Sequence, residues 1–408
     1  MPSPDSLSIG LLAPSYRGFN TLDGGIASHF ADLSAALAAE GHRVRVVTPI
    51  PPAGFQQSPA PAGVTFVTFD PSMPRWLHRA TGWRWQLHML ADRRWRARQA
   101  AVALLATHDV APFDCIETSS SGLWGLSLVR QRTRPPVVTR VSTTAAQLVS
   151  HNAGVSHWVD RIEQAWERNL ALHSDALVTH TVAHRDEVCH QWTLPASALH
   201  LVPHGIPMPN DGELPSPPPG RPPHVLYVGR FEHRKGIDVL LAVIPAVLKA
   251  APGVTFDLVG QDHDGYWQNR FRRENPDMPA DRVRFHGKVS ADELRAAYRD
   301  CDVFVAPSRY ESFGLIYVEA MAWGKPVIGC RAGGIPEVVA DGETGLLAKP
   351  SDETDLCDTL LRLCIDPGLR AQLGRQARHR ARELFSLETL ACRSVALYRD
   401  VIAARTQR

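Results

Sequence analysis

The fold is decided by Tyr310-Glu-Ser-Phe-Gly-Leu-Ile-Tyr-Val-Glu-Ala-Met-Ala-Trp-Gly324. This stretch follows a short apolar run, Val303-Phe-Val-Ala-Pro307, which predicts a buried strand that ends at a proline. A helical pattern then begins near Gly314 and stops at Gly324, because glycine is favoured just past the end of a helix. A buried strand, a loop and a helix in this order predict an α/β fold, in which ligands bind at the carboxyl ends of the strands.

Two glutamates in this stretch, Glu311 and Glu319, have seven residues between them and bracket the predicted start of the helix. Backbone N–H groups at Phe313, Gly314 and Leu315 would face an anion docked there, and the helix dipole favours that anion. Carboxylates repel phosphate and bind hydroxyl groups, so the two glutamates suit diols on opposite sides of a diphosphate. This arrangement fits a nucleotide-sugar. The alternative is an amphipathic helix with two solvated glutamates.

Length and composition favour a protein of two domains. The 408 residues exceed the size at which a single core stops growing. A net charge of +2 gives no general attraction to nucleic acid, which we do not expect as a partner. The longest apolar stretch, 237–248, is too short to cross a bilayer, and residues 1–6 lack the basic and apolar regions of a signal peptide. We therefore expect a cytoplasmic protein.

Cysteines and metal-like clusters do not predict a cofactor. The seven cysteines are scattered without a Cys-x-x-Cys motif, so we expect reduced thiols. Residues 180–190 contain three histidines and a cysteine, but no further ligand follows at a convincing zinc spacing. Asp262 and Asp264 resemble the acidic pair that holds a divalent metal in some transferases, and a solvated turn is the alternative. We expect neither a metal nor another cofactor.

The first half of the sequence alternates strand and helix patterns. An apolar strand at 8–14, a loop that ends in Gly24-Gly25, a helical pattern at 26–40 and a strand at 42–48 predict a βαβ unit of a parallel sheet. Further strands are expected at 64–69, 115–116, 136–141 and 176–179.

The pattern restarts after a proline-rich join, which predicts a second doubly wound half. Residues 205–223 contain eight prolines and cannot form regular elements. Strands are expected at 225–229, 254–259, 283–285, 303–305 and 326–329, with a helix from Ile237. We predict an acceptor-binding domain at 1–205, a hinge at 206–223, a nucleotide-sugar-binding domain at 224–385 and a closing helix at 386–408 that returns to the first domain.

Two loops of the second half carry candidate ligand-binding residues. In the loop 229–236, Arg230 and Lys235 can offset the charge of a departing nucleoside diphosphate, a role that metal ions fill elsewhere. A basic surface turn is the alternative. In the loop 331–337, Gly333 and Gly334 permit close approach of the backbone to a ligand, or they serve a tight turn.

Together these motifs resemble the donor domain of the retaining glycosyltransferases of family 4, which have the GT-B fold. The resemblance covers most of 225–350 in order, whereas in the first half it rests on Gly24-Gly25, Gly41-His42 and the sheet pattern. The matching residues are Gly229-Arg230, Lys235-Gly236, Pro307 to Gly314, Glu319 to Met321, Gly324 to Val327, Gly333 to Glu337 and Asp341 to Leu347.

The resemblance implies two doubly wound Rossmann-like domains that face each other across a cleft. It also implies roles for single residues. Arg230 and Lys235 would bind the donor phosphates, Glu311 the sugar hydroxyls and Glu319 the ribose. The backbone N–H groups of Phe313 to Leu315 would hold sugar and phosphate, and the Gly24-Gly25 loop would cap the phosphate from the other domain.

The activity implied is metal-independent transfer of a sugar from a UDP- or GDP-sugar to a hydroxyl of a glycan, lipid-linked or small-molecule acceptor. Two alternatives stay open. A nucleotide-sugar epimerase of the GT-B fold would need a closed site that admits water. A donor-binding module without turnover would need only the nucleotide-sugar site.

The sequence departs from the family pattern after the fifth expected strand. Family members often carry a His-Thr pair there, and this chain has Ser142-Thr143. A serine cannot supply an imidazole's hydrogen bond or charge, so Thr143, Glu117 or His29 substitutes for it, or the mechanism does not need it. Glu117, Ser142 and Thr143 are therefore candidates for the acceptor side. His204 stands where the family commonly has asparagine, and we expect it to pack at the hinge.

Residues 75–98 contain seven arginines, four tryptophans and a single acid, Asp92. Basic residues interleaved with tryptophan suit the interface of an anionic membrane, or a phosphate-bearing acceptor. The first interpretation predicts peripheral contact with the inner face of the plasma membrane. The alternative is an ordinary surface helix whose tryptophans pack inward.

Overall fold

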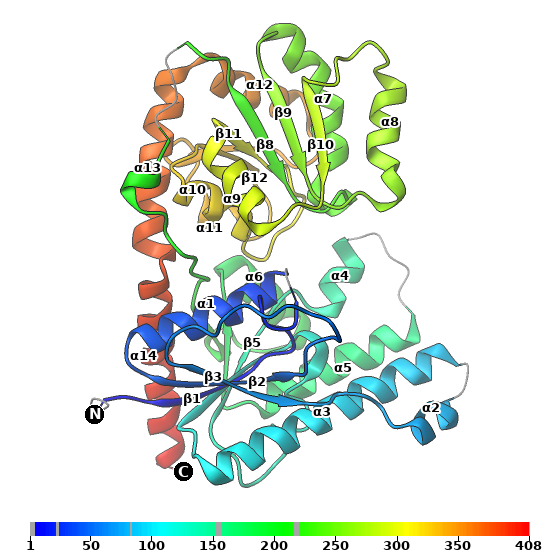
Figure 1. The fold of residues 1–408 in the computed structure, drawn as a ribbon, viewed down its shortest axis with the longest axis vertical. Coiled ribbons are helices and arrows are strands. Elements are labelled where there is room, and N and C mark those ends of the chain that lie inside the picture. The colour runs from blue at the N-terminus through cyan, green and yellow to red at the C-terminus, as the bar shows by residue number, and fades with distance from the viewer. Residues whose placement is uncertain (1–4, 22–23, 82–83, 152–156, 216–219, 408) are drawn as a thin grey trace. The chain divides into compact units, whose positions relative to one another are not determined.

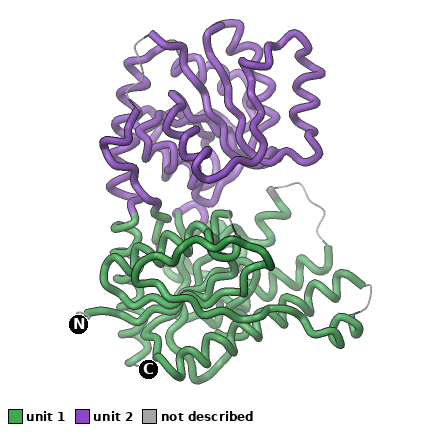
Figure 2. Tube along the Cα trace, viewed as in Figure 1, with its two compact units in different colours: residues 1–180, 185–205, 387–408 green, residues 181–184, 206–386 purple. Residues whose placement is uncertain are grey.

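A computed structural model describes residues 5–21, 24–81, 84–151, 157–215 and 220–407. The chain forms two compact units, shown in separate colours in Figure 2. Unit 1 comprises Met1–His180, Arg185–Gly205 and Leu387–Arg408, and unit 2 comprises Thr181–His184 and Ile206–Ser386.

Unit 1 is built on a seven-stranded parallel sheet (Figure 1). The strand order is β3-β2-β1-β4-β5-β6-β7, so the direction of winding reverses between β1 and β4. Ligands of such sheets bind beyond the carboxyl ends of the strands at this reversal, the topological switch point. The strands are β1 (Ser8–Leu12), β2 (Arg43–Pro49), β3 (Val64–Phe69), β4 (Cys115–Ser119), β5 (Val137–Arg140), β6 (Ala176–Thr179) and β7 (Leu199–Leu201).

Helices cover both faces of this sheet because successive strand residues point to opposite sides. Leu11 belongs to the core that contains residues of α1 and α14, and its neighbour Leu12 belongs to the core that contains residues of α3 and α5. The helices are α1 (Gly25–Ala39), α2 (Arg75–Thr81), α3 (Trp85–Val110), α4 (Ala145–His151), α5 (Trp158–His173), α14 (Leu387–Thr406) and α6 (Val182–Trp192), whose first residues, Val182 to His184, belong to unit 2.

Unit 2 repeats the same winding with six parallel strands in the order β10-β9-β8-β11-β12-β13. Its switch point lies between β8 and β11. The strands are β8 (His224–Val228), β9 (Thr255–Val259), β10 (Val283–Gly287), β11 (Val303–Val305), β12 (Val327–Cys330) and β13 (Gly345–Ala348). The helices are α7 (Ile237–Ala250), α8 (Tyr266–Glu274), α9 (Ala291–Asp300), α10 (Leu315–Ala322), α11 (Ile335–Val338), α12 (Glu353–Ile365) and α13 (Pro367–Phe385).

The predicted α/β class with two doubly wound Rossmann-like halves is confirmed, and each predicted strand is present. The sequence analysis missed β7 and β13, which have three and four residues. Runs this short carry little periodicity, and β13 begins with a glycine. In the described part of the chain, no helix is both long and apolar enough to cross a membrane.

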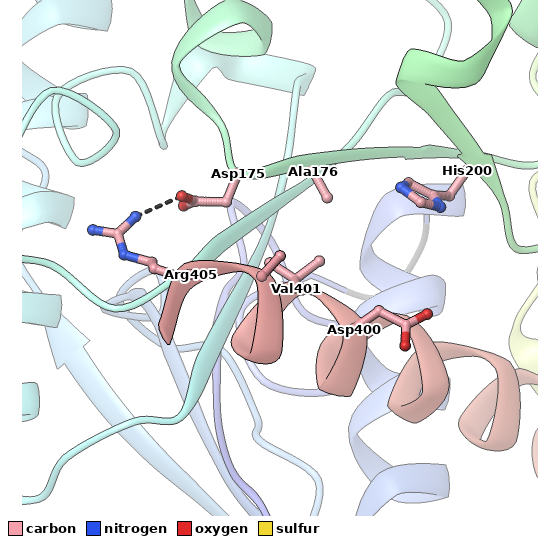
Figure 3. A pocket seen from close by; sticks show the side chains of 7 residues that line it. Asp175, Ala176, His200, Asp400, Val401 and Arg405 are labelled. Carbon is pink, nitrogen blue, oxygen red and sulfur yellow. Dashed lines mark hydrogen bonds and ion pairs between the residues drawn. The ribbon is translucent and has the colours of Figure 1, made fainter. Parts of the chain in front are cut away.

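The C-terminal helix α14 packs in unit 1, where it joins α1 in one core. Arg405 near its end donates to Asp175 Oδ1 at 2.5 Å. Figure 3 shows this ion pair beside a cavity of about 200 Å³ that His200 and Val401 also line. Asp175 directly precedes β6, so the cavity lies away from the carboxyl edge at which such sheets bind ligands.

Candidate active site

Three loops of unit 2 begin at the carboxyl ends of β8, β11 and β12, at and beside the switch point. The Gly334 N–H donates to the carbonyl of Glu311 at 2.8 Å, and the Arg309 N–H donates to the carbonyl of Arg234 at 2.8 Å. These bonds tie the three loops together. The loops are 229–236, which leads to α7, 306–314, which leads to α10, and 331–334, which leads to α11.

Glu311 lies at the centre of this loop cluster and is only 8% exposed. Its Oε1 forms an ion pair with Lys235 and accepts a hydrogen bond from Ser308 Oγ at 3.1 Å. Its Oε2 lies 3.4 Å from Arg234 Nη1. Burial alone would raise the pKa of Glu311, but Lys235 and Arg234 lower it below the ordinary value. The side chain is therefore a charged, hydrogen-bonded carboxylate at neutral pH.

Arg234 is a residue of this cluster that the sequence analysis missed. It is 6% exposed, and it donates to the carbonyl of Tyr310 at 3.1 Å and to Glu232 Oε1 at 3.0 Å. The available signal was the run His233-Arg-Lys235, from which only the lysine was selected. An arginine can reach a buried carboxylate and neighbouring carbonyls at once, because its guanidinium carries five donors in a fixed fork.

A second ion pair fixes the geometry of the same loops. Arg309 binds Asp238, in the first turn of α7, through two parallel bonds of 2.7 and 2.8 Å. The same guanidinium donates to the carbonyl of His233 at 2.5 Å. Burial raises the pKa of Asp238, and Arg309 lowers it to a net value below the ordinary one. The loop that carries Glu311 is thereby held against the loop that carries Lys235.

Arg230 is exposed to solvent, unlike Lys235. It follows β8 by two residues, and its side chain is 62% exposed, with Nη2 at 3.2 Å from Glu232 Oε1. The structure thus brings Lys235 and Glu311 into contact and leaves Arg230 accessible at the same edge of the sheet.

Helix α10 begins beside Glu311, with Gly314 as its N-cap at φ 97° and ψ 62°. A Cβ at Gly314 would lie 2.6 Å from the Tyr317 ring, so a larger residue would be strained here. Among the residues that the structure describes, no acceptor is found for the N–H groups of Gly314 and Leu315. Both groups are therefore available to an anion, and their binding of one stays a prediction. Phe313, immediately before them, is buried.

Glu319 lies on α10 and is half-buried. Tyr298 O–H donates to its Oε2 at 2.7 Å, which fixes the direction of the carboxylate.

Gly333 and Gly334 allow the third loop to pack on the loop of Glu311. A Cβ at Gly334 would lie 2.5 Å from the carbonyl oxygen of Ser312, so only glycine allows this approach. Close packing between two stretches of protein therefore explains these glycines, and contact with a ligand remains a proposal.

Glu117, a candidate for the acceptor side, lies in the core of unit 1 on β4 with 0% exposure. Its Oε1 accepts from Arg140 Nε at 2.7 Å and lies 3.4 Å from His29 Nε2. Its Oε2 accepts from the hydroxyl of Tyr398, on α14, at 2.6 Å. Burial raises its pKa, but Arg140 and His29 bring it down to about 2. Both oxygens are engaged within unit 1, and we assign Glu117 to the support of α14 rather than to the acceptor.

His29 and His204 pack together beside Glu117. Their Nδ1 atoms are 2.9 Å apart, and the ring of His204 also stacks on His180 with centroids 3.8 Å apart. His204 therefore packs among other histidines. Burial, with a further contribution from Arg140, lowers the pKa of His29 to about 4, so this imidazole is neutral at pH 7.

The remaining candidates of unit 1 lie at the carboxyl edge of its sheet. Ser142 follows β5, and its Oγ is 3.2 Å from Ser119 Oγ at the end of β4. Thr143 is its half-buried neighbour. Gly24 and Gly25 form the N-cap and the first residue of α1, after the loop that follows β1. This is the edge at which the sheet's switch point predicts a ligand.

Both halves of the chain match family models. Residues 23–208 match the model described as Glycosyltransferase Family 4, and residues 215–380 match the model of glycosyl transferases group 1. The D-inositol 3-phosphate glycosyltransferase of Corynebacterium glutamicum (strain R) is 30% identical over 294 residues, which are 68% of this chain and 69% of that protein. The chain belongs to glycosyltransferase family 4.

Two further relatives of this family 4 chain match nearly its full length. The glycogen synthase of Mycobacterium tuberculosis (strain CDC 1551 / Oshkosh) is 27% identical over 405 residues, 92% of this chain and 91% of that protein. The solved structure of sucrose-phosphate synthase from Thermosynechococcus elongatus has a TM-score of 0.75 and 25% identity, and the match covers 98% and 100% of the two chains. The protein is a glycosyltransferase of the GT-B fold.

The metal-like patterns of the sequence do not gather into a metal site in this glycosyltransferase. Among the described residues, no group of three or more His, Cys, Asp or Glu side chains could hold a metal ion. Asp262 accepts from the N–H groups of Trp267 and Gln268 at 3.2 and 2.9 Å, so it caps the start of α8. All seven cysteines are free thiols.

Proposed function

We propose that this protein transfers a sugar from a UDP- or GDP-sugar to a hydroxyl of its acceptor, with retention of anomeric configuration and without a metal ion. The observation that carries the proposal is the cluster of Lys235, Arg234 and Glu311 beside the N-terminus of α10, at the switch point of unit 2. It combines positive charge, two backbone N–H groups without an acceptor among the described residues, and a charged carboxylate that can accept hydroxyl groups. A nucleotide-sugar presents the complementary phosphates and hydroxyls.

The diphosphate binds where cationic side chains and free N–H groups meet. Gly314 and Leu315 direct N–H groups at it from the start of α10, and the dipole of the helix adds attraction. Arg230 is accessible at the same edge, and Lys235 exchanges its ion pair with Glu311 for a phosphate oxygen. These cations stabilise the charge that grows on the leaving nucleoside diphosphate as the sugar–phosphate bond breaks.

Two carboxylates grip the hydroxyl groups at the two ends of the donor. Glu311 is charged and buried, so it accepts a sugar hydroxyl in a site of low polarity, where such a bond is strong. Glu319 lies five residues beyond Gly314, or about 7.5 Å along the helix at 1.5 Å per residue. Tyr298 holds it in the direction in which it accepts the ribose hydroxyls.

The acceptor hydroxyl needs no dedicated histidine in this proposal. Its oxygen forms the new bond to the anomeric carbon on the face from which the diphosphate departs, and its proton passes to a leaving phosphate oxygen. The Ser142-Thr143 pair at the edge of unit 1 then only positions the acceptor. The names of the relatives support a glycan or a phosphorylated small molecule as acceptor, and a lipid-linked sugar has the same reacting group.

We also propose that the protein acts in the cytoplasm, where free thiols such as its seven cysteines persist.

Release of free nucleotide tests this function. The protein is incubated with UDP- and GDP-sugars, with and without candidate glycan and inositol phosphate acceptors. A transferase releases nucleotide in step with a glycosylated product. A change in the configuration of the donor sugar without an acceptor would indicate an epimerase, and tight donor binding without release would indicate a module that only binds.

A further inference from the structure

The exposed tryptophans among the described residues lie on three neighbouring helices of unit 1. Trp76 and Trp85 are 65% and 63% exposed, and Trp158 is 46% exposed. The other described tryptophans are buried or half-buried. Tryptophan is normally largely buried, so three exposed indoles in one region are unusual. The expectation that the tryptophans of residues 75–98 pack inward is therefore wrong for Trp76 and Trp85, and Trp83 lies outside the described residues.

The three tryptophans come from neighbouring helices of unit 1, labelled α2, α3 and α5 in Figure 1. Trp158 Nε1 donates to Gln86 Oε1 at 2.9 Å, which joins the starts of α5 and α3. Trp85 and Trp158 line one shallow hollow. Helix α2 meets α3 through Thr81 and the ring of His88, and none of its residues is buried.

Exposed arginines flank these tryptophans. Arg75, Arg79 and Arg84 are exposed, and none of them forms an ion pair within the described parts of the chain. On a helix, residues 76 and 79 are three apart and share one side, so Arg79 is a neighbour of Trp76. We name the surface formed by Arg75, Trp76, Arg79, Arg84, Trp85 and Trp158 the Arg/Trp surface.

Three arginines further along α3, Arg93, Arg94 and Arg96, have structural partners instead. Arg93 pairs with Glu163 at 2.6 Å, and Arg96 pairs with Asp92 at 2.8 Å. The guanidinium of Arg94 lies 5.4 Å from the centroid of the Trp166 ring. The arginines of this segment therefore include Arg75, Arg79 and Arg84, which form no ion pair among the described residues, and Arg93, Arg94 and Arg96, whose partners hold α3 in place.

We propose that the Arg/Trp surface docks on an anionic lipid bilayer. Tryptophan rings are favoured at the level of the lipid headgroups, because the ring is apolar and its N–H bonds to water or carbonyl groups. Arginines beside them meet headgroup phosphates, and each contributes a favourable term near an anionic surface. In a symmetric contact between two copies of the protein, the same arginines would face each other and their positive charges would repel. A second copy is therefore disfavoured as the partner of this surface.

Vesicle flotation at low salt tests the proposal. Wild-type protein should float with vesicles of phosphatidylcholine and phosphatidylglycerol in equal parts, and it should stay behind with pure phosphatidylcholine. The triple variant Arg75→Gln, Arg79→Gln, Arg84→Gln should lose about a hundredfold in partitioning, since each cation near the surface contributes about a fivefold factor. Binding should also weaken as salt rises.

A matched control separates local docking from net charge. The variant R132Q/R273Q/R375Q removes three other exposed arginines, and it should bind the vesicles nearly as well as wild type. For the aromatic part, Trp76→Ser with Trp85→Ser should lower binding at least tenfold. Val110→Ser with Ile365→Ser, which replaces residues 88% and 67% exposed, should not. Circular dichroism of each variant checks that it is folded.

Three outcomes would overturn the proposal. Wild-type protein that stays in the soluble fraction with anionic vesicles would assign the surface to a soluble phosphate-bearing ligand. If the two triple-arginine variants lost vesicle binding equally, net charge and not the Arg/Trp surface would explain the binding. A wild-type dimer in sedimentation that W76S/W85S converts to a monomer would make the surface a contact between copies. Lys235→Ala, which disables the proposed donor site, should float like wild type, so this test is independent of the proposed reaction.

Discussion

Replacing Glu117 with glutamine should destabilise unit 1 far more than a change of one charge normally does. Glu117 and Arg140 are 0% and 2% exposed and share a hydrogen bond of 2.7 Å. Glutamine has nearly the same shape, but it leaves the guanidinium of Arg140 buried without its counter-charge. It also weakens the bond from Tyr398, which holds α14 to the sheet.

The magnitude follows from the pKa of the carboxyl group. The folded pKa of about 2 lies about 2.5 below the ordinary 4.5, which corresponds to about 3 kcal/mol of unfolding free energy at neutral pH. Because the folded pKa is depressed, this stability is present above pH 4.5 and is lost as the pH falls towards 2. Loss of one partner of a buried ion pair typically costs about 3–5 kcal/mol, which agrees.

Hydrogen exchange read by mass spectrometry measures this loss unit by unit. In Glu117→Gln, the free energy of opening should fall by about 3–5 kcal/mol for peptides of β4, β5 and α14. Peptides of β8 and α10 in unit 2 should exchange as in wild type and serve as the internal reference. Glu40→Gln, at an exposed position of unit 1, serves as the control. Exchange in β4, β5 and α14 that matches the control would refute the assignment of Glu117 as a structural anchor.

Four further predictions concern the donor site and pH. Glu319→Ala should weaken nucleotide binding by about 1.5–3 kcal/mol in calorimetry, because the ribose hydroxyls lose a charged acceptor; unchanged affinity in a folded variant would remove Glu319 from the site. Arg230→Ala and Lys235→Ala should each lower kcat about a hundredfold, since both stabilise charge on the leaving group; wild-type turnover in either would contradict that role. Excess EDTA should leave the rate of wild-type enzyme unchanged, and loss of activity that magnesium or manganese restores would refute the metal-free proposal. The unfolding free energy of unit 1 should fall by up to about 3 kcal/mol as the pH drops from 6.5 to about 4, because the unfolded chain protonates His29 before the folded chain does; urea denaturation should show this slope in wild type and lose it in His29→Gln.

The sequence was sufficient for the fold and for the positions of the three loops at the switch point of unit 2. Apolar runs located the core strands, and Gly314 located the start of α10. Both signals come from residues that are close together in the sequence. They can therefore be read without knowing which residues lie near them in the folded protein. The parallel order of the strands then brings the carboxyl ends of β8 and β11 together.

Contacts between distant residues could not be read from the sequence. Arg309 and Asp238 are ordinary charged residues until the loops meet, and Glu117 was a candidate for the acceptor side although it is fully buried. Likewise, Glu337 caps the N-terminus of α6 by accepting from the N–H groups of Val182 and Ala183 at 2.7 and 2.8 Å. Both bonds lie within unit 2, to which Thr181–His184 belong, and the sequence carries no local signal for them.

The basic segment shows the same limit in another form. Composition marked residues 75–98 as one membrane-like stretch, yet only the structure separates Arg93 and Arg96, which pair with acids, from Arg75, Arg79 and Arg84. One of those acids, Glu163, lies on α5, far along the sequence. Partners of this kind decide which charges are available to a ligand.

Proton NMR of the anomeric signals during turnover tests the central claim most directly. The donor is the UDP- or GDP-sugar that releases nucleotide with an acceptor, and the spectra follow its anomeric proton into the product. The account predicts a product with the donor's anomeric configuration, formed about a hundredfold more slowly by Lys235→Ala. A product of inverted configuration, or wild-type turnover in both Lys235→Ala and Glu311→Ala, would contradict it.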